Sequence, residues 1–290
     1  MSDREDLLHR VIRRATPRGL RNWMRNPRAS ARWLGTAWRW RRSGAVRLDL
    51  GSGITLLCHP ESARTFGAFR SDPDSMAEFA EFRAAAGPGS RLYDVGAHYG
   101  FFSLATLALG GPSSRVLALE PSQRACRVLD ANLKLAAAGG RALAVRAAAG
   151  PRDGTLAMIA GGIASENYMF AATGNRPDTV AVPQYSLPGM ERLCGWIPTH
   201  LKLDIEGFEY EVLTAAENLA ALASWRPTLF LELHCDFIRQ RGFDPGDVLR
   251  ALAGRGYRSL SHHGSHAAPG DILARPLARL RLTYAADGLA

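Results

Sequence analysis

Five ionisable side chains stand at the ends of two predicted strands in the second half of the sequence, LKLDIEG and LELH. Side chains alternate between the two faces of a strand, so the aliphatic residues share one face and the ionisable ones the other. A buried parallel strand is ordinarily apolar on both faces, so charged groups near its carboxyl end need a chemical reason. The five residues are Lys202, Asp204, Glu206, Glu232 and His234.

These residue types can move a proton. A carboxylate or a neutral imidazole can deprotonate a hydroxyl, so we predict Asp204 and His234 as candidate bases, with Glu206 as a third. Lys202 can orient Asp204 or stabilise negative charge that develops on an oxygen. Hard divalent cations also bind carboxylate oxygens, and Asp204, Glu206 and Glu232 could hold one. The motifs do not require a metal, and we predict none.

A purely structural interpretation of these residues stays open. Lys202 could neutralise Asp204 in a buried ion pair, and Glu206 could cap a helix that begins near residue 208. His234, taken alone, could be a core histidine whose hydrogen bonds are satisfied. Ion-pair networks of this kind can imitate functional sites.

The segment YDVGAHYGFF supplies a second group of candidates. Asp94 lies at the end of a predicted strand, and Gly96 and Gly100 follow it before a predicted helix. Gly96 permits a tight turn and the close approach of a ligand, and free N–H groups at a helix start favour polar or anionic atoms. Ala97 and His98 occupy the second-glycine region of a dinucleotide fingerprint, so the pattern is D-x-G-x-x-x-G and not G-x-G-x-x-G.

Glu120 ends the next predicted strand and is followed by Pro121. It lies 20 residues beyond Gly100, where an acidic residue accepts the ribose hydroxyls of an adenosine ligand. Together the two signals predict a nucleotide-like ligand at this loop. Simpler alternatives remain: Asp94 could cap the helix, the glycines could serve the turn, and Glu120 could be a surface carboxylate.

Strands alternate with helices along most of the chain, which indicates an α/β protein with a parallel sheet and helices on both faces. The length of 290 residues and the hydrophobic fraction of 47% favour one main core. Strands are predicted over residues 91–95, 115–119, 142–146, 199–205, 228–233 and 257–260, with a final antiparallel strand over 278–285. Helices are predicted over residues 73–86, 99–109, 122–138, 208–222 and 244–253.

Two regions interrupt or precede this alternating series. Residues 48–89 are expected to hold a small hairpin and a helix that lead into a main domain over 90–290. Residues 150–198 are rich in Gly, Pro, Asn and Ser and predict an insertion near the site with at most short strands. Because loops beside a sheet edge carry specificity, we expect this insertion to act as a lid or to bind the acceptor. Its candidate residues are Glu166, Asn167, Tyr168 and Tyr185.

The net charge of +9 is concentrated at the N-terminus. Residues 1–47 form an arm with 13 arginines, three acidic residues and four of the six tryptophans, so the remaining chain is nearly neutral. This composition fits peripheral contact with an anionic membrane. Alternatively, the tryptophans pack on the main domain and the arginines form a solvated face. The nearly neutral body argues against a nucleic-acid partner.

No window of the sequence approaches the roughly 18 apolar residues that span a bilayer, and no secretory pattern opens the chain. A cytoplasmic protein, with the arm reaching the inner membrane surface, is expected. The four cysteines are scattered and form no C-x-x-C pair, which predicts reduced thiols.

Four stretches together resemble the FkbM-type S-adenosylmethionine-dependent methyltransferases, over about residues 90–260. The stretches are DVGAHYGFFSL (94–104), LEPS (119–122), LKLDIEGFEYEVL (201–213) and LFLELH (229–234). His98 stands where the family usually has Asn.

The resemblance implies a class I methyltransferase fold, a Rossmann-like three-layer sandwich whose seven-stranded sheet is mostly parallel with one antiparallel strand. It implies S-adenosylmethionine as cofactor, S-adenosylhomocysteine as product, and O-methylation of a hydroxyl on a sugar, a glycan, a lipid-linked saccharide or another secondary metabolite. The implied cofactor-binding residues are Asp94, Gly96, Ala97, His98, Gly100, Glu120 and Pro121. The family's second signature corresponds to Lys202, Asp204, Glu206, Gly207 and Glu209.

Three other classes remain as alternatives. An NAD-dependent oxidoreductase would share the strand, loop and ribose acid, but its glycine pattern is imperfect here. An RNA methyltransferase would explain the basic arm, although the body lacks an arginine-lined binding surface. In a non-catalytic membrane-surface scaffold, the arm would be the functional part.

Overall fold

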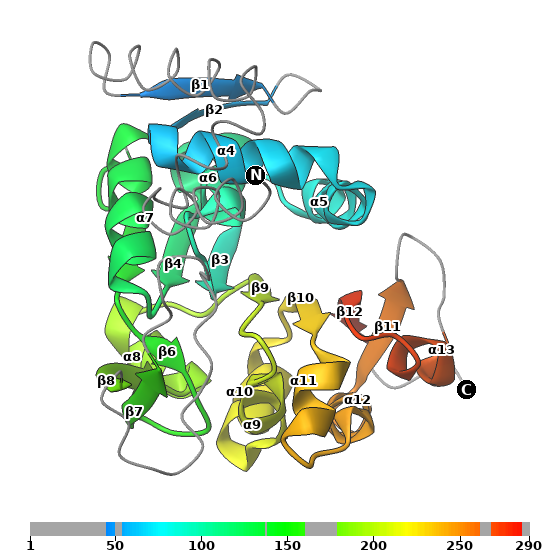
Figure 1. Cartoon of the computed structure of the whole chain (residues 1–290). Coiled ribbons are helices and arrows are strands. Elements are labelled where there is room, and N and C mark those ends of the chain that lie inside the picture. The colour runs from blue at the N-terminus through cyan, green and yellow to red at the C-terminus, as the bar shows by residue number, and fades with distance from the viewer. Residues whose placement is uncertain (1–44, 50–53, 137, 160–178, 262–267, 286–290) are drawn as a thin grey trace, which may run out of the picture. The chain divides into compact units, whose positions relative to one another are not determined.

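The computed structural model describes residues 45–49, 54–136, 138–159, 179–261 and 268–285 (Figure 1). The chain divides into two compact units, Met1–Val46 and Arg47–Ala290, and the second contains the main sheet and the candidate site. The predictions for arm residues 1–44 and for Glu166, Asn167 and Tyr168 lie outside the described residues.

Seven strands form the main sheet in the order β11-β12-β10-β9-β3-β4-β5. β12 runs antiparallel to both of its neighbours, and the other pairings are parallel. This confirms the expected mostly parallel sheet with one antiparallel strand. The strands are β3 (Arg91–Val95), β4 (Arg115–Leu119), β5 (Ala142–Val145), β9 (His200–Leu203), β10 (Thr228–Leu233), β11 (Tyr257–Ser261) and β12 (Ala278–Tyr284).

The register of the sheet sets the two polar stretches side by side. Lys202 on β9 pairs with Phe230 on β10 and with Asp94 on β3. Glu232 lies two residues beyond Phe230, and Asp204 lies two residues beyond Lys202. Parallel strands end at a common edge, so β3, β9 and β10 deliver their last side chains to one place.

Helices cover the sheet in the layers expected for alternating strands and helices (Figure 1). The N-terminal half contributes α4 (Pro60–Ser71), α5 (Pro73–Ala85), α6 (Phe101–Gly110) and α7 (Gln123–Leu135). The C-terminal half contributes α8 (Leu187–Cys194), α9 (Glu209–Thr214), α10 (Ala216–Trp225), α11 (Cys235–Gln240), α12 (Pro245–Ala253) and α13 (Pro269–Leu273). A short 3₁₀ turn, η1 (Gly111–Ser113), follows α6.

The two faces of the central strands pack against different partners. The leucines of β9 and β10 belong to one large core that also includes Val212 of α9 and Leu222 of α10. On the opposite face, the ring of Phe230 meets that of Phe82 from α5, which also meets Phe102 of α6. The alternation predicted from the sequence therefore places Lys202 on the face that α5 and α6 cover.

The predicted single helix over residues 208–222 is wrong, because α9 and α10 are separate helices. Ala215 between them has an extended backbone, with φ −67° and ψ 127°. The buried Asn218 side chain holds the break open, since its Nδ2 donates to the carbonyl oxygens of Val212 and Gly150. Its Oδ1 accepts from the N–H of Leu187, which ties α10 to α8.

Several elements were not predicted. Helix α4 follows a hairpin made of β1 (Val46–Asp49) and β2 (Thr55–Cys58), so residues 48–89 hold two helices where one was expected. Helices α11 and α13 were also missed. Within residues 150–198, β7 (Gly154–Ile159) and β8 (Thr179–Tyr185) join β6 (Ala148–Ala149) in a three-stranded sheet, and α8 follows. All four cysteines are free, as expected from their spacing.

Candidate functional site

The turn that follows β3 is held between the ends of its two neighbouring strands. The N–H groups of Gly96 and Ala97 both donate to the carbonyl oxygen of Leu119 at the end of β4, at 3.0 and 2.9 Å. Gly96 has a φ of +78°, and a Cβ there would lie 1.8 Å from the carbonyl oxygen of Asp204. The sequence suggested that glycine is needed here so that a ligand can approach. The structure shows instead that the segment around Asp204 approaches Gly96 too closely for a Cβ atom.

Asp94 caps helix α6 from the end of β3. Its Oδ2 accepts from the N–H of Ser103 at 3.0 Å and from the Ser103 hydroxyl at 2.5 Å. Gly100, the N-cap residue with a φ of +82°, offers no side-chain cap of its own. Burial raises the pKa of Asp94, and its bonds to Ser103 oppose that rise. Asp94 therefore caps the helix, as the simpler alternative from the sequence supposed, and its side chain also lines the pocket described below.

Glu120 holds the same loop from the end of β4. Its two carboxylate oxygens accept from the N–H groups of His98 and Ser122, each at 2.8 Å. His98 has a φ of +49°, which is uncommon for a residue other than glycine. The carbonyl oxygen of Pro121 accepts from Nε of Arg146 at 3.3 Å. The predicted ribose acid is therefore at the expected strand end, and it also fixes the conformation of the loop.

Lys202 is buried in the middle of an ion cluster. Its Nζ lies 2.9 Å from Oε1 of Glu232, 3.2 Å from Oε1 of Glu78 and 3.9 Å from Oδ2 of Asp204. Burial opposes the charge of Lys202, but the neighbouring carboxylates outweigh it and raise the pKa of the ammonium group. Lys202 thus remains charged and fixes the carboxylates around it.

Two members of the ion cluster were missed by the sequence analysis. Glu78 comes from α5, and Arg279 comes from β12. The guanidinium of Arg279 lies 3.5 Å from Glu78 and 3.3 Å from Glu232, so Lys202 and Arg279 bridge the same two carboxylates. Burial raises the pKa of Glu78 to about 7. Burial acts in the same direction on Glu232, but Lys202 and Arg279 outweigh it and lower its pKa to about 2.

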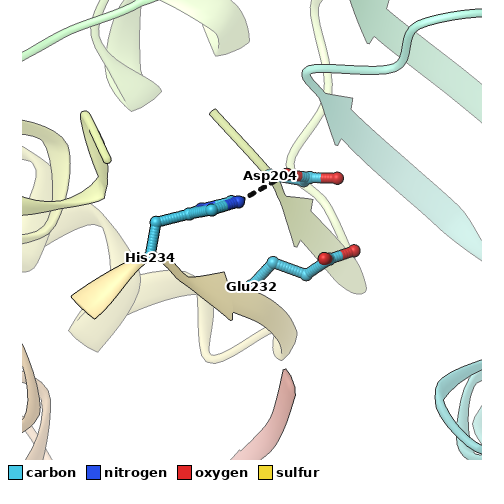
Figure 2. Close-up of side chains that lie close together, drawn as sticks. All are labelled: Asp204, Glu232 and His234. Carbon is cyan, nitrogen blue, oxygen red and sulfur yellow. Dashed lines mark ion pairs between the residues drawn. The ribbon is translucent and has the colours of Figure 1, made fainter. Parts of the chain in front are cut away.

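His234 lies on the other side of Asp204, where the chain leaves β10 (Figure 2). Its Nε2 is 3.8 Å from Oδ1 of Asp204 and 3.4 Å from Oε2 of Glu206. Its Nδ1 is 2.9 Å from Oε1 of Glu209, a fully buried carboxylate that also accepts from two backbone N–H groups. Glu206 has a φ of +55° and does not cap the following helix as the structural alternative supposed.

The carboxylates shift the pKa values of this group. Burial opposes the charge of His234, but the bond to Glu209 and the charges of Asp204 and Glu206 raise its pKa to about 9. Burial and the charge of Glu232 raise the pKa of Asp204 well above its ordinary value. Burial likewise raises that of Glu206. Negative charge is thus in surplus around His234.

A small pocket of about 200 Å³ joins the loop after β3 to the ion cluster. Its lining residues come from α4 and α5, from the end of β3 and the loop that follows it, from the start of α6, and from the ends of β9, β10 and β12. They are Thr65, Phe66, Phe69, Ser75, Asp94, Gly96, Ala97, His98, Tyr99, Phe101, Phe102, Lys202, Asp204, Glu232 and Arg279.

The predicted site residues are therefore only partly brought together. Asp94, Gly96, Ala97, His98, Lys202 and Asp204 line the pocket, whereas Glu120, Pro121, Glu206 and His234 are not among its lining residues. No described residue of the insertion at 150–198 lines the pocket.

The strand order and the pocket at the carboxyl ends of β3 and β9 define a class I methyltransferase fold. Comparison with protein families then gives the family. Residues 94–259, more than half of the chain, match the Methyltransferase FkbM domain, and the chain belongs to that family. Nothing in this match favours an oxidoreductase or a scaffold. No curated protein matches the chain.

Several solved structures are similar to this chain at low sequence identity. Methyltransferase FkbM from Methylobacillus flagellatus is 18% identical, with a TM-score of 0.44, over 77% of this chain and 60% of that one. A TehB-like SAM-dependent methyltransferase from Corynebacterium glutamicum is 11% identical, with a TM-score of 0.41, over 78% and 97%. Aeropyrum pernix fibrillarin, solved with bound S-adenosyl-L-methionine, is 11% identical, with a TM-score of 0.39, over 69% and 68%. The chain thus spans 60% of the length of the FkbM structure.

Among the described residues, no helix is long and apolar enough to cross a membrane.

Proposed function

We propose that this protein transfers the methyl group of S-adenosylmethionine to a hydroxyl group of a sugar, a glycan, a lipid-linked saccharide or another secondary metabolite. The observation that carries the proposal is the pocket, whose wall includes both the loop after β3 and the Asp204 carboxylate. Such a wall can hold a methyl donor and a hydroxyl acceptor against one another.

The loop side of the pocket fits a cofactor that carries a ribose and a carboxylate. Helix α6 begins at Phe101, where Asp94 caps the N–H of Ser103, and a helix N-terminus favours an anionic group. Glu120, at the end of β4, is the candidate acceptor for ribose hydroxyls. When bound, S-adenosylmethionine would supply an activated methyl group on a sulfonium centre.

The ion-cluster side of the pocket fits a hydroxyl acceptor. Asp204 is the candidate base because it lines the pocket and one third of its side chain is exposed. Lys202 restrains Asp204 from 3.9 Å. His234 and Glu206 lie beside Asp204 and are the next candidates. Methyl transfer needs chiefly an acceptor oxygen held in line, and a fixed carboxylate both orients the hydroxyl and accepts its proton.

Aromatic side chains close the remaining wall of the pocket. Phe69 of α4 packs on Phe101 with ring centroids 4.1 Å apart, and Phe66 meets the same ring at 5.3 Å. Apolar walls keep water from the reacting groups and strengthen the interactions of the charges beside them. The helix α4 thus contributes to the site although it precedes the matched family domain.

Titration calorimetry with S-adenosylhomocysteine tests the donor side, with NADH titrated in parallel. We expect micromolar binding of S-adenosylhomocysteine, equivalent to about −8 kcal/mol, and none of NADH. Glu120→Gln should weaken this binding at least tenfold. Asp130→Asn is the matched control, because Asp130 is a half-exposed surface carboxylate on the helix that follows. Binding of NADH alone would overturn the proposal.

Transfer of labelled methyl groups from S-adenosylmethionine to a panel of hydroxylated saccharides and lipid-linked saccharides tests the acceptor side. Asp204→Asn should retain S-adenosylhomocysteine binding and lose most turnover, because it preserves shape and removes the proton acceptor. Turnover by Asp204→Asn at the wild-type rate would remove Asp204 from the reaction. Label recovered only on nitrogen or carbon acceptors would overturn the proposed O-methylation.

A further inference from the structure

Glu209 fixes the orientation of the His234 ring. Glu209 is fully buried, and its Oε1 accepts from the N–H groups of Ile205 and Gly207, which hold the carboxylate in place. The same oxygen lies 2.9 Å from Nδ1 of His234. Metal-binding histidines are oriented in this way, with one ring nitrogen donating to a carboxylate and the other left for the ion.

The other ring nitrogen faces the Asp204 carboxylate, with which it forms a long ion pair (Figure 2). The His234 side chain is nine-tenths buried, yet its Nε2 is 3.8 Å from Asp204 and 3.4 Å from Glu206. Charge-assisted hydrogen bonds are about 2.7–2.9 Å long. The ring and its neighbours are thus separated by more than a hydrogen bond, although they carry complementary charge.

The spacing of three of these side chains suits a common cation. One ligand atom from each of Asp204, Glu232 and His234 lies within 4.8 Å of the other two. Atoms bound to one ion at about 2.1 Å are about 3.0 to 4.2 Å apart in octahedral geometry. Small side-chain adjustments would therefore bring all three into coordination.

We propose that Asp204, Glu232 and His234 form a binding site for a divalent metal cation. Two carboxylates and one imidazole suit a first-row ion that accepts both oxygen and nitrogen ligands, so Mn²⁺ is the probe of choice. Glu206 lies close enough to His234 to bind a water molecule of such an ion. The site extends beyond the proposed function, because cation binding does not depend on the methyl donor.

The charges around the site favour a cation. Carboxyl groups outnumber basic side chains here: Glu78, Asp204, Glu206, Glu209 and Glu232 face Lys202, Arg279 and His234. After such side-chain adjustments, these carboxylates would balance the charge of a bound divalent cation.

Glu232 can serve both the ion cluster and a metal. Its Oε1 lies 2.9 Å from Lys202, and its Oε2 lies 3.3 Å from Arg279. Each carboxylate oxygen can accept two partners, so contacts to two basic side chains leave coordination capacity. If the proposed function holds, the ion would lie at the pocket wall, where it could lower the pKa of an acceptor hydroxyl.

The test is titration of the full chain with MnCl₂ after treatment with a chelator, followed by calorimetry and by loss of the electron paramagnetic resonance signal of free Mn²⁺. We expect one ion per chain, bound at least tenfold more weakly by His234→Ala and by Asp204→Asn. Glu209→Gln should weaken binding 10- to 100-fold through loss of the ring orientation. Asp247→Asn is the control, since Asp247 is an exposed carboxylate paired with Arg250 on α12.

Absence of a one-to-one complex, or one that His234→Ala and Asp204→Asn leave unchanged, would overturn the metal site. S-adenosylhomocysteine binding, measured on every variant, reports whether the fold survives and separates the two proposals. Binding of Mn²⁺ without S-adenosylhomocysteine would support the metal site and contradict the proposed function. Binding of S-adenosylhomocysteine without Mn²⁺ would do the reverse.

Discussion

Replacing Gly96 by alanine tests whether two chain segments must meet for the site to form. Gly96 has a φ of +78°, and an alanine Cβ would lie 1.8 Å from the carbonyl oxygen of Asp204. Gly89 is a matched control, because its φ is +81° and no atom lies within 4 Å of the corresponding Cβ position. The two substitutions therefore share the strain of a positive φ and differ in the collision.

The shared cost of left-handed backbone for alanine is about 1–2 kcal/mol. Contacts to a real Cβ essentially never fall below 3.0 Å, so at Gly96 the Asp204 backbone or the loop must move by about 1.2 Å. Forced displacement in a packed interior costs a further ~1–3 kcal/mol. We therefore expect Gly96→Ala to lose about 2–5 kcal/mol of unfolding free energy and Gly89→Ala about 1–2 kcal/mol.

Urea unfolding followed by circular dichroism measures the difference between the two variants. Because the shift also displaces the cofactor loop from the end of β9, S-adenosylhomocysteine affinity should fall at least tenfold in Gly96→Ala and stay unchanged in Gly89→Ala. Displacement of reacting groups by about 1 Å can cost on the order of 100-fold in rate, so methyl transfer should fall further. Equal losses of stability in both variants, with wild-type cofactor affinity, would refute the argument from close approach.

Three other expectations concern the buried charges and the arm. Lys202→Met removes the nearest cation from the buried Glu232 and should lower the unfolding free energy by about 3–5 kcal/mol in urea unfolding. Lys134→Met breaks only an exposed pair with Asp130 and should lower it by less than about 0.5 kcal/mol. Since burial raises the pKa of Glu78 to about 7, the folded protein retains a proton that the unfolded chain loses near pH 4.3. The unfolding free energy should therefore fall as pH rises between these values, and Glu78→Gln should lack this part of the pH dependence in urea titrations. The full chain should co-sediment with anionic liposomes and not with neutral ones. Deleting residues 1–44 should abolish the co-sedimentation with anionic liposomes.

Each of these three predictions can be contradicted by a specific result. Similar losses in the two lysine variants would show that the buried carboxylates do not depend on Lys202. An unchanged pH slope in Glu78→Gln would assign the titration to another group. Co-sedimentation that survives the deletion would remove the membrane role of the arm.

The positions of the strands and of the first candidates could be predicted because their signals are local. Alternation along 201–205 and 229–233 identifies strands, and the side chains that interrupt the apolar pattern mark the carboxyl edge. Asp94 and Glu120 were placed at the correct strand ends. The partners of these carboxylates could not be predicted, because Asp94 accepts from a backbone N–H of helix α6 and Glu120 accepts from one of the loop.

Two members of the ion cluster, Glu78 and Arg279, could not be identified from the local pattern around Lys202, because they lie on elements far away in the sequence. A weak signal did exist for Glu78. It shares a helical face with Ser75, Phe79 and Phe82, all buried, so helical spacing alone placed a carboxylate on an apolar face. The helical spacing of these residues predicts that Glu78 is buried and therefore paired with a cation.

The break between α9 and α10 had no signal of its own. Residues 208–222 contain neither an internal proline nor an internal glycine, and their apolar spacing is continuous enough for one helix. The break depends on Asn218, whose side chain bonds to residues of α9 and of the segment around Gly150. Such a long-range cap overrides local helix propensity.

The origin of the ion cluster bears on how this protein can be shortened for expression. The family match ends at residue 259, but the cluster draws Glu78 from before it and Arg279 from beyond it. A recombinant fragment trimmed to 94–259 would also lack β12, so β10 would become an unpaired edge strand that can pair with other molecules. Such a fragment should aggregate, whereas termini placed before α4 and after β12 should give a soluble protein that retains the whole pocket.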